Sequence, residues 1–117
     1  MTNELEVKKL FSKIGNHFSH CLFLASNVDV ALSISNPEKD LFINTSSLIN
    51  TLKNSSYDKF IYMSTAGVYD GLIGKVDTNT KLDPKNPYCI SKYASEQYLK
   101  HYYDKGVVSN YYILRLG

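Results

Sequence analysis

The sequence contains too few cysteines to suggest a metal site. Its 117 residues include only Cys21 and Cys89, which lie far apart and have neither a second cysteine nor a histidine at ligand spacing. Structural zinc sites need four such ligands, so we expect no bound metal. Cys21 opens an apolar run, and we expect it to be a small buried hydrophobic residue.

Long apolar runs and a strong charge of either sign are also absent. No run approaches the roughly 18 residues of a membrane span, and the charged, amphipathic N-terminus lacks the apolar segment of a signal peptide. Lysine and arginine together number 13 against 11 aspartates and glutamates, and Arg115 is the only arginine. Because the positive and negative charges nearly balance, neither nucleic acid nor an anionic membrane is an expected partner. We expect a cytoplasmic protein.

What remains is the composition of one globular domain. Hydrophobic residues make up 44% of the chain and charged residues 21%, and the length allows one modest core. Alternation of helices and strands favours an α/β fold with a parallel sheet and right-handed crossovers. The spacing of apolar residues predicts helices over 4–14, 37–53 and 87–104, and strands over 20–25, 59–63 and 111–116.

Local signals support several of these elements. The run at 20–25 is short and almost continuously apolar, which is typical of a parallel strand buried on both faces. Asn36-Pro37 and Asn86-Pro87 each combine a capping asparagine with a proline in the first turn, which indicates a helix start. Residues 70–86 are rich in glycine, asparagine and proline and are predicted to form a long loop.

Small and polar side chains follow the predicted strands where functional residues of parallel sheets gather. Leu24–Ser26 end the first strand, and Ser64 and Thr65 follow the second. Tyr88 and Lys92 begin the last helix after a loop that returns to the same edge, and their spacing of four places them on one helix face. We expect these residues to meet at the carboxyl edge of the sheet.

Tyr88 and Lys92 suit proton transfer. A tyrosine titrates near a pKa of about 10, and a nearby ammonium lowers that pKa by favouring the phenolate. A hydroxyl from Thr65 can bind the same substrate oxygen, which completes a set for a carbinol/carbonyl pair whose hydride carrier is a cofactor. A Tyr-x-x-x-Lys pair alone is weak evidence, because the chain contains ten tyrosines and chance matches are common.

Three segments, in order and spacing, carry a resemblance to a known family: FIYMSTAGVYD (60–70), PKNPYCISKYASEQYL (84–99) and ILRLG (113–117). They resemble the extended short-chain dehydrogenase/reductase family, and within it the UDP-glucose 4-epimerase-like NAD-dependent epimerase/dehydratases. Residues 23–52 resemble the strand, loop and helix that come before them. The resemblance implies a partial Rossmann-like, doubly wound parallel sheet of about three strands with flanking helices.

The resemblance also implies roles for individual residues. Tyr88 matches the catalytic tyrosine, Lys92 the lysine that binds the nicotinamide ribose, and Thr65 the residue that hydrogen-bonds the substrate hydroxyl. The expected cofactor is NAD, with NADP less favoured, and the expected partner is a nucleotide sugar. The residues expected beside the cofactor are Leu24, Ala25, Ser26, Asn44, Met63, Ser64, Tyr88 and Lys92.

Two departures from the family pattern bear on activity. Ala66-Gly67 stand where sugar 4,6-dehydratases carry an Asp-Glu pair, which favours epimerisation over dehydration. None of the six glycines forms a G-x-x-G-x-x-G loop after a strand. We therefore expect residues 1–117 to form a partial NAD(P)-binding domain without the first βαβ half and the C-terminal substrate region, and to bind NAD weakly or not at all.

Three interpretations remain open. The first is a fragment of an NAD-dependent nucleotide-sugar epimerase, inactive or active alone. The second is a catalytically dead remnant that acts as an interaction or assembly module. The third is another NAD(P)-dependent sugar-nucleotide oxidoreductase, dehydratase or decarboxylase of the same superfamily. A separate hypothesis is that the isolated chain self-associates, either over the edge of the first strand or as a homodimer through helices 37–53 and 87–104.

Overall fold

A three-stranded parallel sheet organises the computed structural model, which describes residues 1–70, 72 and 74–117. Its strands follow the order β1-β2-β3, which confirms the α/β class. The strands are β1 (His17–Phe23), β2 (Ser56–Thr65) and β3 (Val108–Leu116). The helices are α1 (Glu4–Ile14), α2 (Val30–Ser35), α3 (Pro37–Leu41), α4 (Ser47–Asn54) and α5 (Pro87–Asp104), with a π-helical turn at Phe42–Ser46 and a 3-10 turn at Ala66–Tyr69.

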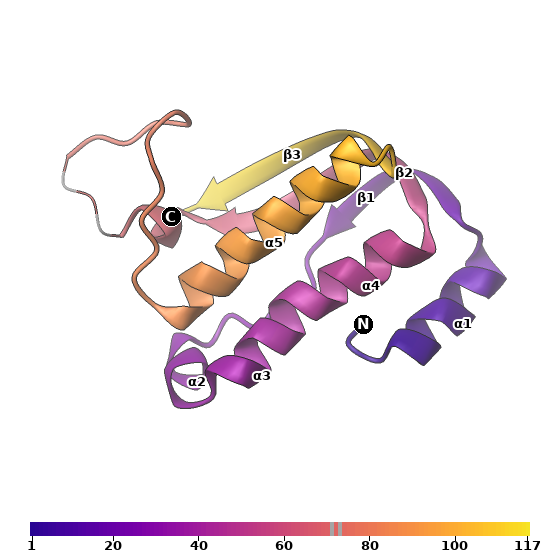
Figure 1. Ribbon diagram of the computed structural model, residues 1–117, viewed down its shortest axis with the longest axis horizontal. Helices are drawn as coiled ribbons and strands as arrows, with labels where there is room; N and C mark the ends of the chain where they lie inside the picture. The colour runs from indigo at the N-terminus through magenta and orange to yellow at the C-terminus, as the bar shows by residue number, and fades with distance from the viewer. Residues whose placement is uncertain (71, 73) are drawn as a thin grey trace.

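The two helix starts at asparagine and proline are confirmed. The side chain of Asn36 accepts a hydrogen bond from the backbone N–H of Lys39, and Asn86 accepts one from Cys89 at 2.9 Å. The predicted helix 37–53 consists of α3, the π-helical turn and α4 in uninterrupted succession (Figure 1). The short helix α2 was not predicted, and Gly71 of the predicted loop 70–86 lies outside the described residues.

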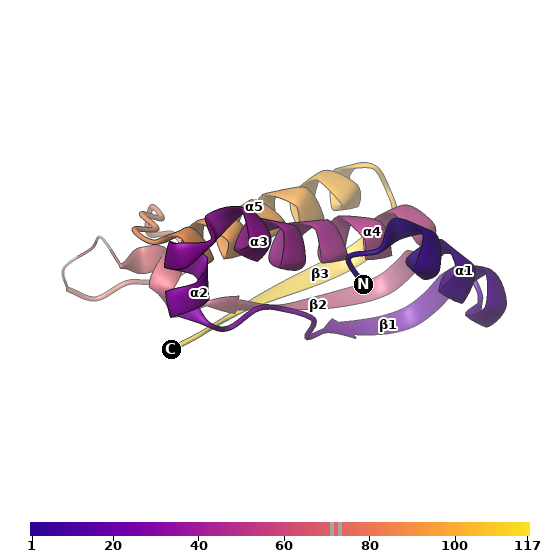
Figure 2. The same cartoon turned by 90° about the horizontal axis from the view of Figure 1, so that it is seen from below.

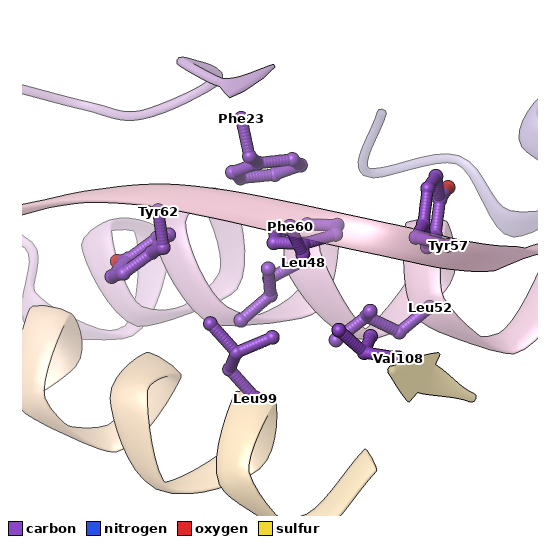
Figure 3. Close-up of a cluster of buried hydrophobic side chains, with 8 residues drawn as sticks. All are labelled: Phe23, Leu48, Leu52, Tyr57, Phe60, Tyr62, Leu99 and Val108. Carbon is purple, nitrogen blue, oxygen red and sulfur yellow. The ribbon is translucent and has the colours of Figure 1, made fainter. Parts of the chain in front are cut away.

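The helices α3, α4 and α5 lie together on one side of the sheet, as Figure 2 shows from the edge. Between them and the strands lies an aromatic-rich core, in which Phe23 stacks on Phe60 with ring centroids 5.9 Å apart. Burying each such side chain stabilises the fold by about 1.5–3 kcal/mol. The core residues, drawn in Figure 3, are Phe23, Leu48, Leu52, Tyr57, Phe60, Tyr62, Leu99 and Val108.

The opposite face of the sheet is open. Leu22, Tyr112 and Leu114 point away from the helices and are 57%, 53% and 43% exposed. The prediction that the first strand is buried on both faces is therefore wrong for this chain, because α3, α4 and α5 all pack on the same side. Cys21, expected to be buried, is only half-buried at the edge of the sheet.

Within the described part of the chain, no helix is both long enough and apolar enough to cross a membrane.

Candidate functional site

A cavity of about 220 Å³ opens at the carboxyl ends of β1 and β2. It brings together side chains from the loop after β1, the end of β2 and the first turns of α5. Larger hollows of about 450 Å³ beside Arg115 and about 360 Å³ along the edge of β1 contain no paired tyrosine and lysine. The small cavity is lined by Leu24, Ser26, Val28, Met63, Ser64, Thr65, Tyr88, Lys92 and Leu116.

Most of the residues predicted from the sequence therefore meet around one cavity, and two do not. Ala25 packs against the hydrophobic core and lines the hollow along β1. Asn44 is buried behind the cavity, with only 1% of its side chain exposed. Its link to the site runs through Ser26, whose hydroxyl oxygen lies 3.0 Å from Asn44 Oδ1.

Lys92 is held inside the protein with its ammonium at the cavity wall. Only 3% of the residue is exposed, and Nζ donates a hydrogen bond to Ser26 Oγ at 3.3 Å. The ammonium also lies 4.6 Å from the centre of the Tyr62 ring, a cation–π contact. Desolvation lowers the pKa of Lys92 to about 8, against the opposing attraction of Glu96 and Asp40.

Tyr88 shares the cavity with Lys92, but its electrostatics differ from the expectation. Burial, with smaller contributions from Cys89 and Asp40, raises the pKa of Tyr88 above its ordinary value. The lowered pKa expected from a neighbouring lysine is therefore not seen. The physical reason is that the Lys92 ammonium contacts Ser26 and the Tyr62 ring, while the phenol of Tyr88 loses solvent.

Thr65 and Ser64 end β2 with their hydroxyls in different roles. Thr65 Oγ1 accepts a hydrogen bond from the backbone N–H of Gly67 at 3.1 Å, which caps the 3-10 turn and leaves its own O–H hydrogen available. Ser64 is buried and donates to Glu96 Oε1 at 2.6 Å. Thr65 is thus the hydroxyl that can meet a ligand, and Ser64 ties the strand to α5.

Glu96 is a functional neighbour that sequence reasoning missed. It is buried with 1% exposure and receives two hydrogen bonds from Arg115, from Nη2 to Oε2 at 2.8 Å and from Nε to Oε1 at 3.1 Å. Arg115 also donates to the hydroxyl of Tyr69. These contacts raise the pKa of Arg115 and join α5, β3 and the turn after β2 beside the cavity.

Asp40 is a second missed residue. It is fully buried and accepts hydrogen bonds from the side chains of Asn27, Asn44 and Ser91. Its spacing of four residues from Asn44 on one helical segment was the available signal, since such pairs share a helix face.

The cavity fits the nicotinamide end of a dinucleotide better than a metal ion. No group of three histidine, cysteine, aspartate or glutamate side chains that could bind a metal occurs in the described ranges. Apolar walls from Leu24, Met63 and Leu116 suit a flat aromatic ring, and the hydroxyl and ammonium of Ser26 and Lys92 suit ribose hydroxyls. These residues are the ones that would hold the nucleoside, and none of the lining residues offers a cradle for a pyrophosphate.

Comparison with known families places the chain. The model of the NAD dependent epimerase/dehydratase family matches residues 1–117. The chain belongs to this family. Its structural neighbours among solved proteins include UDP-glucose 4-epimerase from Thermotoga maritima in complex with UDP-glucose, with a TM-score of 0.83 and 28% identity, and this match covers 97% of the chain and 38% of that protein. The Rossmann-like architecture is thereby confirmed.

Family members with different reactions are similar to this one. The UDP-Glc/GlcNAc 4-epimerase from Campylobacter jejuni has a TM-score of 0.82 and 29% identity, covering 97% of the chain and 35% of that protein. A dTDP-D-glucose 4,6-dehydratase from Mus musculus is 30% identical over an alignment that covers 77% of the chain and 29% of the mouse protein. The chain thus spans about a third of the length of each relative. The comparisons show that it belongs to a family of enzymes.

Proposed function

We propose that this chain carries the catalytic segment of an NAD-dependent nucleotide-sugar epimerase. One observation carries the proposal: Thr65, Tyr88 and Lys92 come from two separate segments and line the same small cavity at the carboxyl end of β2. A phenol, a hydroxyl and an ammonium around one cavity form a proton-transfer set for a sugar carbinol. The relatives that act on nucleotide sugars support the same substrate class here.

Each side chain has a defined part in this reaction. Bound NAD supplies the acceptor and later the donor of the hydride. Tyr88 takes the proton from the sugar hydroxyl as the carbinol is oxidised, and returns it after the keto sugar has presented its opposite face. Thr65 orients the same oxygen through its free O–H. Lys92, protonated at neutral pH because its pKa is about 8, supplies positive charge at the wall of the same cavity, where it suits the hydroxyls of a bound ribose.

The packing around Gly67 supports epimerisation over dehydration. A Cβ added at Gly67 would lie 2.5 Å from Cys89 Sγ and 3.3 Å from Asp70 Oδ2. An acidic side chain at this position would require the Cys89 side chain to move, and Ala66-Gly67 themselves supply no acid or base. Without that pair, the elimination of water lacks its acid and base.

The same proposal includes NAD as the cofactor, the cytoplasm as the place of action and a homodimer as the assembly. The helices 37–53 and 87–104 present outward apolar side chains that suit a second copy: Leu41, Phe42 and Ile90 are 47%, 52% and 49% exposed. Sedimentation at tens of micromolar, about the range in which moderate dimers form, tests the assembly. A clean monomer would count against it.

A second candidate is favoured by the open face of the sheet. Leu22, Tyr112 and Leu114 form an exposed apolar surface of a kind that marks interaction sites. Under this alternative, the chain is a catalytically inactive assembly module that has kept the family fold. Loss of binding to every nucleoside and nucleotide-sugar ligand, together with stable association through that face, would favour it.

Two experiments test the epimerase proposal. In any longer protein that contains this chain, Tyr88→Phe is expected to abolish turnover of the nucleotide sugar while the fold is kept, because only the phenolic proton is lost. Near-normal turnover in that variant would remove Tyr88 from the proposal. For the 117-residue chain alone, calorimetric titration is expected to show weak or no NAD binding, because the sequence has no G-x-x-G-x-x-G loop.

A further inference from the structure

A fully buried carboxylate lies behind the candidate site without touching the cavity. Asp40, in α3, is 0% exposed, and each of its oxygens receives a hydrogen bond. Oδ1 accepts from Asn27 Nδ2 at 2.7 Å and from Asn44 Nδ2 at 3.1 Å, while Oδ2 accepts from Ser91 Oγ at 2.6 Å. Every partner donates to it, which is the environment of an ionised carboxylate.

The orientation of the Asn44 amide in this network is fixed by its partners. Asn44 Oδ1 lies 2.7 Å from the backbone nitrogen of Asn27, and a backbone N–H can only donate. The amide nitrogen must therefore face the other way, toward Asp40 and toward Ser91 Oγ at 2.9 Å. The negative charge of Asp40 polarises this amide and makes Asn44 Oδ1 a stronger acceptor.

The polarised oxygen of Asn44 reaches the site through Ser26. Ser26 Oγ lies 3.0 Å from Asn44 Oδ1 and 2.8 Å from the carbonyl oxygen of Asn27, so its one hydrogen is directed to this pair of acceptors. Its lone pairs are then left for Lys92 Nζ, at 3.3 Å. Donors and acceptors thus alternate from the carboxylate to the ammonium, with the Ser26 hydrogen shared between Asn44 Oδ1 and the Asn27 carbonyl.

We infer that Asp40 is a positioning residue which, through Asn44 and Ser26, holds a hydroxyl oxygen toward the Lys92 ammonium and helps to keep that ammonium charged. Its value for catalysis rests on the proposed function of Lys92. Asp40 touches neither cavity nor substrate. It acts on the Lys92 ammonium from the neighbouring helix of the same layer, where α3 packs against α5.

The other groups that face Lys92 set the size of the effect. Glu96, one turn further along α5, also favours the charged form, and the Tyr62 ring of β2 contributes a cation–π contact. Tyr88 of α5 shares the cavity. Burial opposes all of these and leaves the pKa of Lys92 at about 8, so the removal of one supporting charge should lower it further.

The experiment is a titration of Lys92 by NMR in the 117-residue chain carrying ¹³C-labelled lysine. The Lys92 side-chain signal is assigned by its loss in Lys92→Arg and followed from about pH 6 to about pH 11. We expect a pKa of about 8 in the wild type and a fall of about half a unit or more in Asp40→Asn. An unchanged or raised pKa in this variant overturns the inference.

Two further variants separate the network from a general charge effect. Asp58→Asn removes the same charge from an exposed site near the start of β2 and should leave the Lys92 pKa unchanged, so an equal shift there contradicts the inference. Ser26→Ala should lower the Lys92 pKa, and Asp40→Asn should add little more in its presence. Additive shifts would mean that no relay through Ser26 exists.

Folding of each variant is checked by the amide spectrum. If Asp40→Asn does not fold, Asn44→Ser takes its place, because it removes the amide that joins Asp40 to Ser26: a lowered Lys92 pKa supports the network and an unchanged one overturns it. No step uses a cofactor, a substrate or turnover, so the positioning role can stand when the epimerase proposal fails. In the same way, loss of turnover in Tyr88→Phe says nothing about Asp40, which keeps the two tests distinguishable.

Discussion

The same three strands form both faces of the sheet, but one face is covered by helices and the other is open. On the covered face, Phe60 and Tyr62 are almost fully buried under α4 and α5, and Ser64 near the end of this face donates a hydrogen bond to Glu96. On the open face, Leu22 and Tyr112 are more than half exposed, although both pair with Ile61 of β2, which lies between the core residues Phe60 and Tyr62. The difference shows that strand patterning alone does not bury a face; the covering helices do.

Phe60→Ala, on the covered face, should cause the largest loss of stability. Phe60 has no exposed surface and contacts Phe23 and Tyr57, so its truncation leaves a cavity in the centre of the core. We expect a loss of about 3–5 kcal/mol in the free energy of unfolding. Urea unfolding followed by circular dichroism measures it, and a loss below about 1 kcal/mol would mean that this face is not the core.

Arg115→Met tests the ion pair on the same face. It leaves the buried carboxylate of Glu96 without its cation, and we expect a loss of about 2–4 kcal/mol, below the fully buried case because Arg115 is partly exposed. The exposed pair of Lys85 and Asp83 provides the control, since Lys85→Met should change stability by less than about 1 kcal/mol. Equal effects in the two variants would contradict the distinction.

Lys92→Met tests the burial of the Lys92 ammonium through the pH dependence of stability. Unfolding returns the lysine to a pKa of about 10.5 from about 8 in the folded protein, so the unfolded chain binds more protons between these values. The wild type should therefore gain stability relative to Lys92→Met as the pH rises from about 8 to about 10.5. The comparison with the variant removes the opposite contribution of Cys21, whose pKa burial raises to about 11. A difference independent of pH would show that Lys92 is not buried as a charge.

Tyr112→Ser should have the smallest effect, because Tyr112 lies on the open face and is 53% exposed. We expect a change of about 0.5 kcal/mol or less in the monomer. If the open face mediates association, the same variant should weaken the dimer in sedimentation. A loss of stability close to that of Phe60→Ala would mean that the two faces are equivalent.

The sequence allowed the local features to be predicted and left the contacts between elements out of reach. The helix starts at Asn36 and Asn86 were predictable because a capping side chain and a proline both act within the first turn of a helix. The meeting of Thr65 and Tyr88 was predicted because parallel strands bring their carboxyl ends to one edge. The partners of Asp40 and Glu96 were missed, since Ser91 and Arg115 are 51 and 19 residues away and only the packing of α5 against α3 and against β3 brings them together.

The burial of the first strand was predicted wrongly for a related reason. The apolar run at 20–25 shows which side chains favour burial. It does not show whether a helix or another strand covers each face of the sheet. The direction of the Tyr88 pKa shift was also misjudged, because the helix spacing says that Lys92 is near and leaves out its contacts with Ser26 and Tyr62.

The most direct test of the catalytic site is ligand binding by the chain itself. Nicotinamide mononucleotide contains the ring and ribose that we propose the cavity binds, and adenosine monophosphate is a matched control with a different base. Titration at millimolar concentration, about the range for a fragment ligand, is expected to shift the NMR signals of Thr65, Tyr88 and Lys92 with the first ligand only, and Lys92→Met should abolish the shifts. Equal shifts with both ligands, or none at these three residues, would contradict the assignment of the cavity as the nicotinamide site.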